Sequence, residues 1–133
     1  MAKRKVFLSY SHGQAEWAKE FAKAIADRGV QVWIDQIEVK AGEPVGEAIE
    51  KGLRESDLFV VLIDPDKIKS PSLLFELGAA IGMGKRVVAI VPKDFDPSEL
   101  PLPLRTRRFL MKVSPSVTAD ELVEAEQPSG QQA

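Results

Sequence analysis

Residues 58–63 are the sequence feature that most constrains the fold: Leu-Phe-Val-Val-Leu-Ile is uninterrupted apolar sequence, stopped by Asp64 and Pro65. Such a run is expected of a strand buried on both faces, and strands of that kind occur in parallel sheets covered by helices. No apolar run reaches the roughly 18 residues that a membrane-spanning helix requires. The run therefore predicts the central strand of an α/β domain that does not enter a membrane.

Short apolar segments alternate with amphipathic ones in the rest of the chain, which indicates a parallel sheet with crossover helices. We predict strands at residues 6–10, 30–35, 58–63, 86–91 and 108–113, and helices at 15–27, 47–55, 71–82 and 118–126. Gly29 is expected to end the first helix, and Thr118 with Glu121 predicts a capping box for the last. We expect one domain over residues 1–126 and a disordered tail or the start of a linker at 127–133.

Composition excludes several kinds of chemistry. The 133 residues include no cysteine and one histidine, so disulfides, thiol catalysis, a histidine zinc cluster and a Ser-His-Asp triad are ruled out. We therefore predict no metal site. The net charge of −2 argues against nucleic acid as a direct partner, because nucleic-acid binders usually carry a basic face. No secretory signal is apparent, and we expect a cytoplasmic protein.

Five strands in a right-handed, doubly wound sheet most simply take the order 2-1-3-4-5, a flavodoxin-like fold with helices on both faces. Ligands of such sheets bind at the carboxyl ends of the strands, where the strand order reverses. Ser9, Tyr10 and Ser11 end the first strand, and Asp64 follows the third. These residues are candidate ligands for a substrate, although ordinary turn chemistry explains them equally well.

One helix carries a single charge. Glu76 is the only charged residue between positions 71 and 84. At about 100° per residue, Leu74, Leu77, Gly78 and Ile81 share the face expected to pack on the sheet, and Glu76 projects from the other face. A solvated surface glutamate remains one interpretation. The other is a functional carboxylate in a sheltered site, because its neighbours on that face are small or apolar.

The order and spacing of these segments resemble the Toll/interleukin-1 receptor (TIR) domain family, in its prokaryotic type, over about residues 4–126. Residues 5–11 resemble its first-strand box, 29–35 its second strand, and 36–45 the following BB loop, with Gly42 at the usual turn. Residues 56–63 resemble the third strand, and 75–92 the third helix and fourth strand. The resemblance implies the flavodoxin-like fold predicted above.

It also implies two possible functions. Some TIR domains are adaptors that associate with other TIR domains, whereas others hydrolyse or cyclise NAD⁺ through an essential glutamate on the third helix, the position of Glu76. NAD⁺ is then a substrate and no cofactor is needed. Many members carry a tryptophan where this chain has Ser72, so stacking on nicotinamide would come from Tyr10, Trp33 or Phe75. Ser72 itself and Asp35 are the remaining candidates for substrate binding.

By the same resemblance, the BB loop packs on a neighbouring subunit and activity depends on self-assembly. Its candidate assembly residues are Ile37, Glu38, Val39, Gly42, Glu43 and Pro44. We expect partners to be NAD⁺, other TIR domains and a C-terminal sensor domain or partner protein, in prokaryotic immune defence. The alternatives are a non-catalytic TIR–TIR interaction module of adaptor or virulence type, and an enzyme similar to the nucleoside deoxyribosyltransferases.

Overall fold

The computed structural model describes residues 5–36, 52, 54–68, 71–100, 104 and 109–125. Strands and helices alternate along the chain, as predicted. The described elements are β1 (Lys5–Tyr10), η1 (His12–Gln14), α1 (Ala15–Asp27), β2 (Gln31–Gln36), β3 (Leu58–Leu62), η2 (Pro65–Lys67), α3 (Pro71–Gly82), β4 (Arg86–Val91), η3 (Pro97–Glu99), β5 (Phe109–Met111) and α5 (Pro115–Ala125), where η marks a 3-10 turn.

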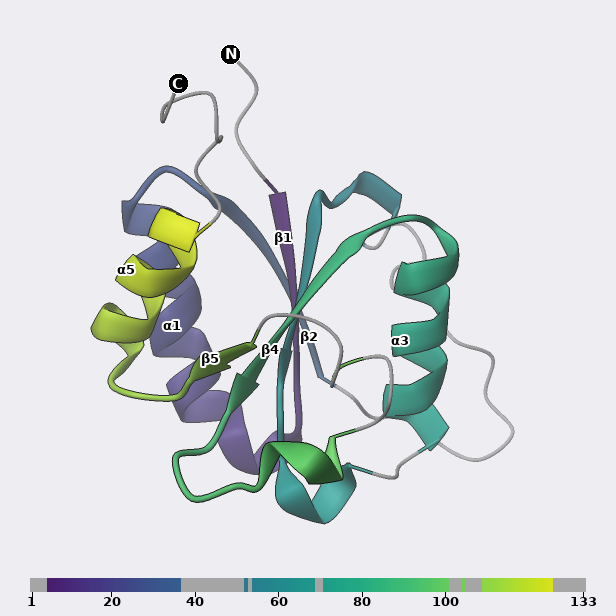
Figure 1. The fold of residues 1–133 in the computed structure, drawn as a ribbon. Coiled ribbons are helices and arrows are strands. Elements are labelled where there is room, and N and C mark those ends of the chain that lie inside the picture. Colours follow the sequence, from purple (N-terminus) through teal and green to yellow (C-terminus); the bar gives the residue numbers. More distant parts are fainter. Residues whose placement is uncertain are drawn as a thin grey trace, which may run out of the picture.

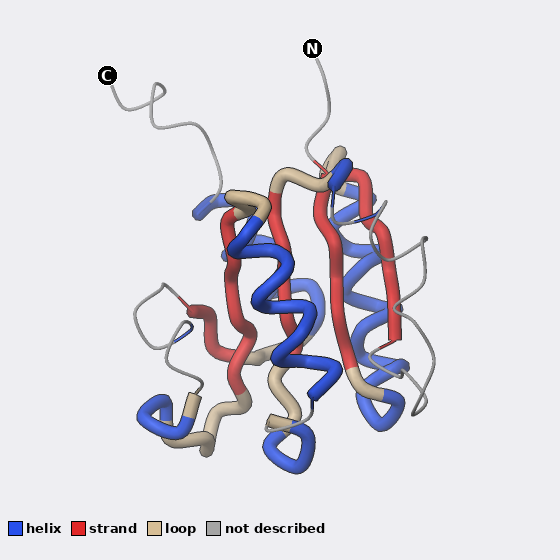
Figure 2. Tube along the Cα trace, turned by 90° about the vertical axis from the view of Figure 1, so that its right-hand side faces the viewer, coloured by secondary structure: helices blue, strands red, loops and turns tan. Residues whose placement is uncertain are grey.

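All five strands form one parallel sheet in the order β2-β1-β3-β4-β5, which confirms the predicted order and the flavodoxin-like fold. Helices α1 and α5 cover one face of this sheet and α3 covers the other, so the molecule has three layers (Figure 1). Figure 2 shows α3 lying along the face of the sheet opposite to the one covered by α1 and α5. Among the described residues, no helix has the length and apolar character needed to cross a membrane.

The core consists of two clusters separated by the sheet, because successive side chains of a strand point to opposite faces. Leu8, Val60 and Ile90 pack below α1 and α5. Phe7 and Phe59 pack below α3, with their ring centroids 5.5 Å apart. All five residues of β3 are buried, as the apolar run predicted. Because both faces of the sheet are covered, its strand ends are the part of the sheet that is left open to a ligand.

The first and third helices end in the same way. The residue after each C-cap is a glycine in the left-handed region, Gly29 with φ of 86° and Gly84 with φ of 75°. After α1, the N–H of Val30 reaches back to the carbonyl of Ile25 at 3.3 Å, the long bond of a Schellman motif. The predicted role of Gly29 is confirmed, and each helix is turned back into the next strand within three residues.

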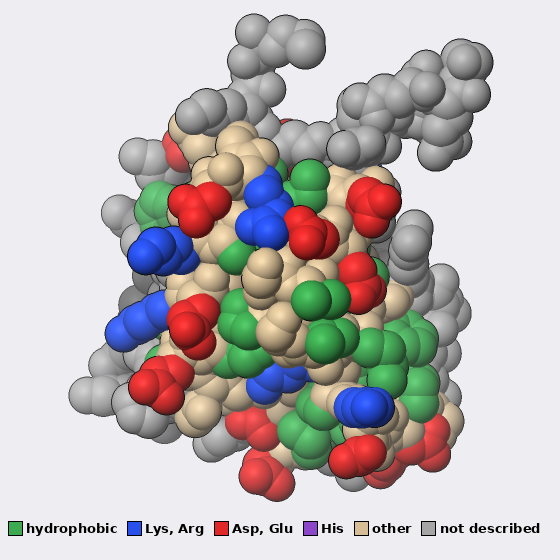
Figure 3. All heavy atoms as spheres, turned by 90° about the vertical axis from the view of Figure 1, so that its left-hand side faces the viewer, with side chains coloured by type: hydrophobic (Ala, Val, Ile, Leu, Met, Phe, Trp, Pro, Cys, Tyr) green, Lys and Arg blue, Asp and Glu red, His purple; other side chains and the backbone are tan. Residues whose placement is uncertain are grey.

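The layer of α1 and α5 is joined by side chains as well as by its apolar core. Trp17 donates its indole N–H to the carbonyl of Val113 at 3.0 Å, and Arg28 pairs with Asp120 at 2.7 Å. On this face of the molecule, charged side chains of both signs are interspersed, and hydrophobic side chains gather in its lower part (Figure 3). The last helix is therefore an integral part of the domain.

The start of α5 corrects one prediction. The helix begins at Pro115, three residues before the predicted start, and the hydroxyl of Ser114 accepts the N–H of Val117 at 3.3 Å. Thr118 lies inside the helix, where its hydroxyl accepts the N–H of Val113 at 3.0 Å. The predicted capping box at Thr118 is therefore wrong. A serine followed by proline supplies the cap and the first helical residue instead.

Strand boundaries differ from the predictions by small amounts. The fifth strand has three residues, Phe109–Met111, within the predicted 108–113. The second strand begins and ends one residue later than predicted, and the third ends one residue earlier. The predicted helix at 47–55 falls largely outside the described residues. Within this range the structure describes residues 52, 54 and 55, and these are helical.

Candidate functional site

The described part of the candidate site lies at the carboxyl ends of β1 and β3, where the strand order reverses. Ser11 comes directly after β1, and Asp64 comes two residues after β3. The turns η2 and η3 lie at the same edge, at the lower end of the molecule in Figure 1. The switch point thus brings together Ser11 and Asp64, as the strand order predicted.

A hydrogen-bonded cluster joins the two strand ends. The hydroxyl of Ser11 donates to Oδ2 of Asp64 at 2.6 Å. The side-chain amide of Gln14, in η1, donates to the carbonyl of Ile63 at 3.0 Å. The other oxygen of Asp64 accepts the N–H of Asp66 at 3.0 Å, which caps η2. Short bonds to a carboxylate are stronger than bonds between neutral groups, so this cluster is a firm link between the loops.

Sequence reasoning placed Ser11 and Asp64 at this point, but it did not identify Gln14. From the sequence, a glutamine in a turn is expected to be solvated, and the position of Gln14 in the sequence does not indicate a contact with another loop. Its role depends on η1, which folds the chain back after Ser11 through the bond from the Gln14 N–H to the Ser11 carbonyl. Only this turn brings its amide to Ile63, 49 residues further along the chain.

The other two residues that end β1 point to opposite faces of the sheet. The Tyr10 side chain is 6% exposed and belongs to the core cluster below α1 and α5. Ser9 is fully buried, and its backbone lies opposite that of Asp35 in β2. A substrate that contacts both side chains would have to reach both faces at once. The structure therefore does not bring Ser9 and Tyr10 together on one surface.

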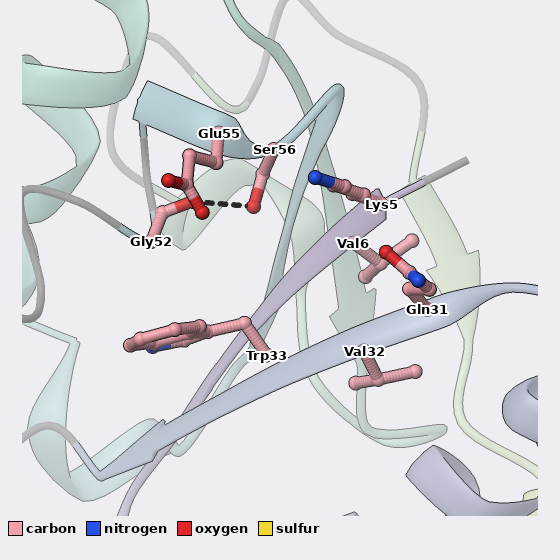
Figure 4. Close-up of a pocket in the computed structure, with 8 residues that line it drawn as sticks. All are labelled: Lys5, Val6, Gln31, Val32, Trp33, Gly52, Glu55 and Ser56. Carbon is pink, nitrogen blue, oxygen red and sulfur yellow. Dashed lines mark hydrogen bonds between the residues drawn. The ribbon is translucent and has the colours of Figure 1, made fainter. Parts of the chain in front are cut away.

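Trp33 lies in a different part of the molecule from Ser11 and Asp64. It stands in the middle of β2 opposite Phe7, and its side chain is 37% exposed. It lines a hollow of about 110 Å³ built from the amino-terminal halves of β1 and β2 and from a helical turn (Figure 4). The lining residues are Lys5, Val6, Gln31, Val32, Trp33, Gly52, Glu55 and Ser56. The structure thus places Trp33 away from the switch point.

Helix α3 contains Ser72, Phe75 and Glu76 in its first two turns. The helix follows η2, so these turns lie at its end nearest the carboxyl edge of the sheet. Among the α3 residues whose exposure the structure describes, Leu77 and Ala80 are buried, at 2% and 0%. Leu74 and Gly78, both predicted to pack on the sheet, are exposed, so that prediction is wrong for these two residues. The described part of the packed face therefore includes Ala80 rather than Leu74.

The side chains of Ser72, Phe75 and Glu76 lie outside the part of the chain that the structure describes. The roles predicted for these three side chains stay predictions.

Among the described residues of the carboxyl edge, Asp96 has a perturbed pKa. Asp96 caps η3 by accepting the N–H of Ser98 at 2.9 Å, and this bond, with a smaller effect of the Ser98 hydroxyl, lowers the pKa of its carboxyl below its usual value. A hydrogen bond to the charged form favours that form. Within the described residues, no group of three or more acidic or histidine side chains is arranged to hold a metal ion.

The predicted assembly residues Ile37, Glu38, Val39, Gly42, Glu43 and Pro44 lie outside the described residues.

A doubly wound parallel sheet in this strand order defines an α/β domain of the flavodoxin-like class. The family model for the TIR domain matches residues 6–126. The chain therefore belongs to the TIR domain family, and its curated bacterial relatives mark it as the prokaryotic type.

Two of the similar curated proteins are named for an activity. The chain is 26% identical over 120 residues to the 2′ cyclic ADP-D-ribose synthase BtTIR of Bacteroides thetaiotaomicron, covering 87% of this chain and 38% of that protein. It is 29% identical over 77 residues to the 2′ cyclic ADP-D-ribose synthase AbTIR of Acinetobacter baumannii, covering 57% of this chain and 29% of that protein. The chain thus spans well under half the length of these relatives.

Solved structures agree with the fold. The TIR domain of a Toll-related receptor from Hydra magnipapillata superposes with a TM-score of 0.66 at 20% identity, covering 90% of this chain and 95% of that one. The RPS4 and RRS1 TIR domain heterodimer gives 0.69 at 14%, covering 92% and 95%. A CMP N-glycosidase from Clostridium botulinum gives 0.61 at 15%, covering 91% and 99%. At these identities the likeness concerns the fold alone.

Proposed function

We propose that this chain cleaves the bond between nicotinamide and ribose in NAD⁺ and that Glu76 is its catalytic carboxylate. The observation that carries the proposal is the place of Glu76. It is the only charged residue of positions 71–84, and it stands in a helix that begins at the carboxyl edge of the sheet. The names of the bacterial relatives, which are synthases of a cyclic ADP-ribose, support this choice of substrate.

The chemistry requires one carboxylate. As the bond from the anomeric carbon to the pyridinium nitrogen breaks, the ribose gains oxocarbenium character, and a nearby carboxylate stabilises that charge. The bonding electrons neutralise the pyridinium, so nicotinamide leaves as a neutral molecule without a general acid. Water attacking the anomeric carbon and losing a proton gives ADP-ribose. A hydroxyl of the adenosine half attacking in the same way gives a cyclic product, which the names of the relatives favour.

Replacement of Glu76 by glutamine tests the proposal directly. We expect Glu76→Gln to lower kcat at least about 100-fold, because the amide has the shape of the carboxylate but not its charge. Nicotinamide release is followed by chromatography. Glu124→Gln is the matched control, since Glu124 is exposed on α5, on the opposite face of the sheet. Equal rates for Glu76→Gln and the unchanged protein would remove Glu76 from the mechanism.

We also propose that catalysis depends on self-association through residues 37–44, in the cytoplasm, under the control of another domain or partner protein. The heterodimer of TIR domains among the similar structures supports association as a property of this fold family. The same assay, run over a range of protein concentrations, then gives a specific rate that rises with concentration. A constant specific rate would mean that the single chain is sufficient.

A non-catalytic interaction module is the second candidate. The observation that favours it is Ser72, which stands where many TIR enzymes have a tryptophan. This function predicts stable association without nicotinamide release at any concentration. Deoxynucleosides and free bases added to the same assay would reveal base exchange, the reaction of the deoxyribosyltransferase alternative.

A further inference from the structure

Ser11, Gln14 and Asp64 form a contact between two loops, and none of these three residues has a part in the proposed cleavage step. The sequence makes Ser11 a candidate substrate ligand. In the structure only 3% of Ser11 is exposed, and its hydroxyl already donates its proton to Oδ2 of Asp64 at 2.6 Å. The alternative acceptor, Oε1 of Gln14, is 3.5 Å away and is the weaker of the two. A hydroxyl engaged in this way has little left to offer a ribose.

Asp64 connects this hydroxyl to the turn that precedes α3. One carboxylate oxygen holds Ser11, and the other accepts the N–H of Asp66 and so caps η2. Ile68, directly after η2, packs against the core cluster below α3. The Asp64 carboxylate therefore links the loop after β1 to η2, the turn that precedes α3.

Gln14 supplies a second, independent tie between the same two loops. Its amide donates to the carbonyl of Ile63 at 3.0 Å, while the N–H of Ile63 continues the ladder with β4 by donating to Ile90 at 2.9 Å. The two ties act at neighbouring points of the segment after β3. Together they fix how far apart the loops stand at the switch point.

We propose that Ser11, Gln14 and Asp64 are positioning residues for the NAD⁺-cleaving reaction, which hold α3, and with it Glu76, at a fixed place relative to the loop after β1. The inference rests on the proposed function. A catalytic group must keep its geometry closely, and a displacement of about 1 Å can cost about 100-fold in rate. Loosening the ties therefore acts on kcat rather than on substrate affinity.

A double-mutant cycle tests this role. We expect Ser11→Ala and Asp64→Ala each to lower kcat about 10- to 100-fold, with KM changed less than about threefold. The double variant should be no slower than the slower single variant, because both substitutions break the same bond. Asp27→Asn, an exposed acid at the end of α1, is the control. Additive effects together with a KM raised tenfold or more would make Ser11 a substrate ligand and overturn the proposal.

Hydrogen exchange provides a readout that does not depend on turnover. In Ser11→Ala and in Asp64→Ala, backbone amides of residues 65–68 and of the first turns of α3 should exchange faster than in the unchanged protein, whereas in Asp27→Asn they should not. The milder Asp64→Asn, which keeps the shape and one acceptor, serves if Asp64→Ala does not fold. Unchanged exchange in α3 overturns the positioning role. If the unchanged protein releases no nicotinamide, the proposed function fails, and the exchange data alone decide whether the ties hold α3.

Discussion

Gly52 allows the indole ring of Trp33 to lie directly against a helical turn. A Cβ atom at this position would lie 2.8 Å from Cε2 of Phe7 and from two atoms of the Trp33 indole. Phe7 is fully buried, so its ring has no free space into which to move. A close approach between a backbone and two aromatic rings therefore depends on the absence of a side chain.

Gly52→Ala is expected to lower the free energy of unfolding by about 1–3 kcal/mol, the usual cost of overpacking a filled core. Denaturant unfolding followed by circular dichroism measures it. Gly78→Ala is the matched control, because Gly78 is exposed inside α3 and a Cβ there meets no atom within 4 Å. That substitution should raise the stability by about 0.5–1 kcal/mol. A Gly52→Ala protein as stable as the original would contradict the packing described.

At the scale of the element, the boundaries of α5 depend on a single cap. Ser114 precedes Pro115, and its hydroxyl accepts the N–H of Val117, which would otherwise lack a partner at the start of the helix. The same sequence pattern, serine then proline, stands at positions 70 and 71 before α3. Capping of this kind sets where a helix begins more firmly than the periodicity of its apolar residues.

Removal of this cap gives a test at the same scale. Ser114→Ala should lower the free energy of unfolding by about 1 kcal/mol, since one N–H loses its acceptor. Glu121→Ala should change it by less than about 0.5 kcal/mol, because Glu121 does not take part in a capping box. Thermal unfolding of both variants measures the difference. The reverse ranking would restore the helix start predicted from Thr118 and Glu121.

The individual elements were predictable to different degrees. The strand β3 followed from its continuous apolar run, because two-sided burial leaves a clear signature. The packed face of α3 did not follow, because this helix is apolar nearly all round and its periodicity has little contrast. For α5, two capping patterns lie four residues apart, and only Ser114 is followed by a proline, the residue favoured at the first helical position.

At the scale of the whole molecule, the strand order was predictable because right-handed crossovers leave few ways to connect five parallel strands. The same rule placed Ser11 next to Asp64. It gave no information about Gln14, whose hydrogen bond to Ile63 depends on the turn η1. It also did not show how far Trp33 lies from the carboxyl end of β2. Topology therefore predicts which strand ends meet, whereas the particular side chains that meet depend on local turns.

The two tryptophans report on opposite sides of the sheet, Trp17 in the α1–α5 layer and Trp33 against Gly52 on the face of α3. If the three layers form one cooperative unit, Trp17→Phe and Trp33→Phe each leave one probe whose fluorescence midpoint in urea coincides with the midpoint from circular dichroism. We expect coincidence in both variants. Separate midpoints in either one would indicate that one layer unfolds without the other.

The identical reversals at Gly29 and Gly84 have a consequence for how such a domain diversifies. Both lie at the amino edge, and each leaves no slack between helix and strand. At the opposite edge, the described connections contain the 3-10 turns η1, η2 and η3 and have no fixed length. Insertions are therefore easier to accommodate at the carboxyl edge, while the amino edge keeps each helix in register with the strand that follows it.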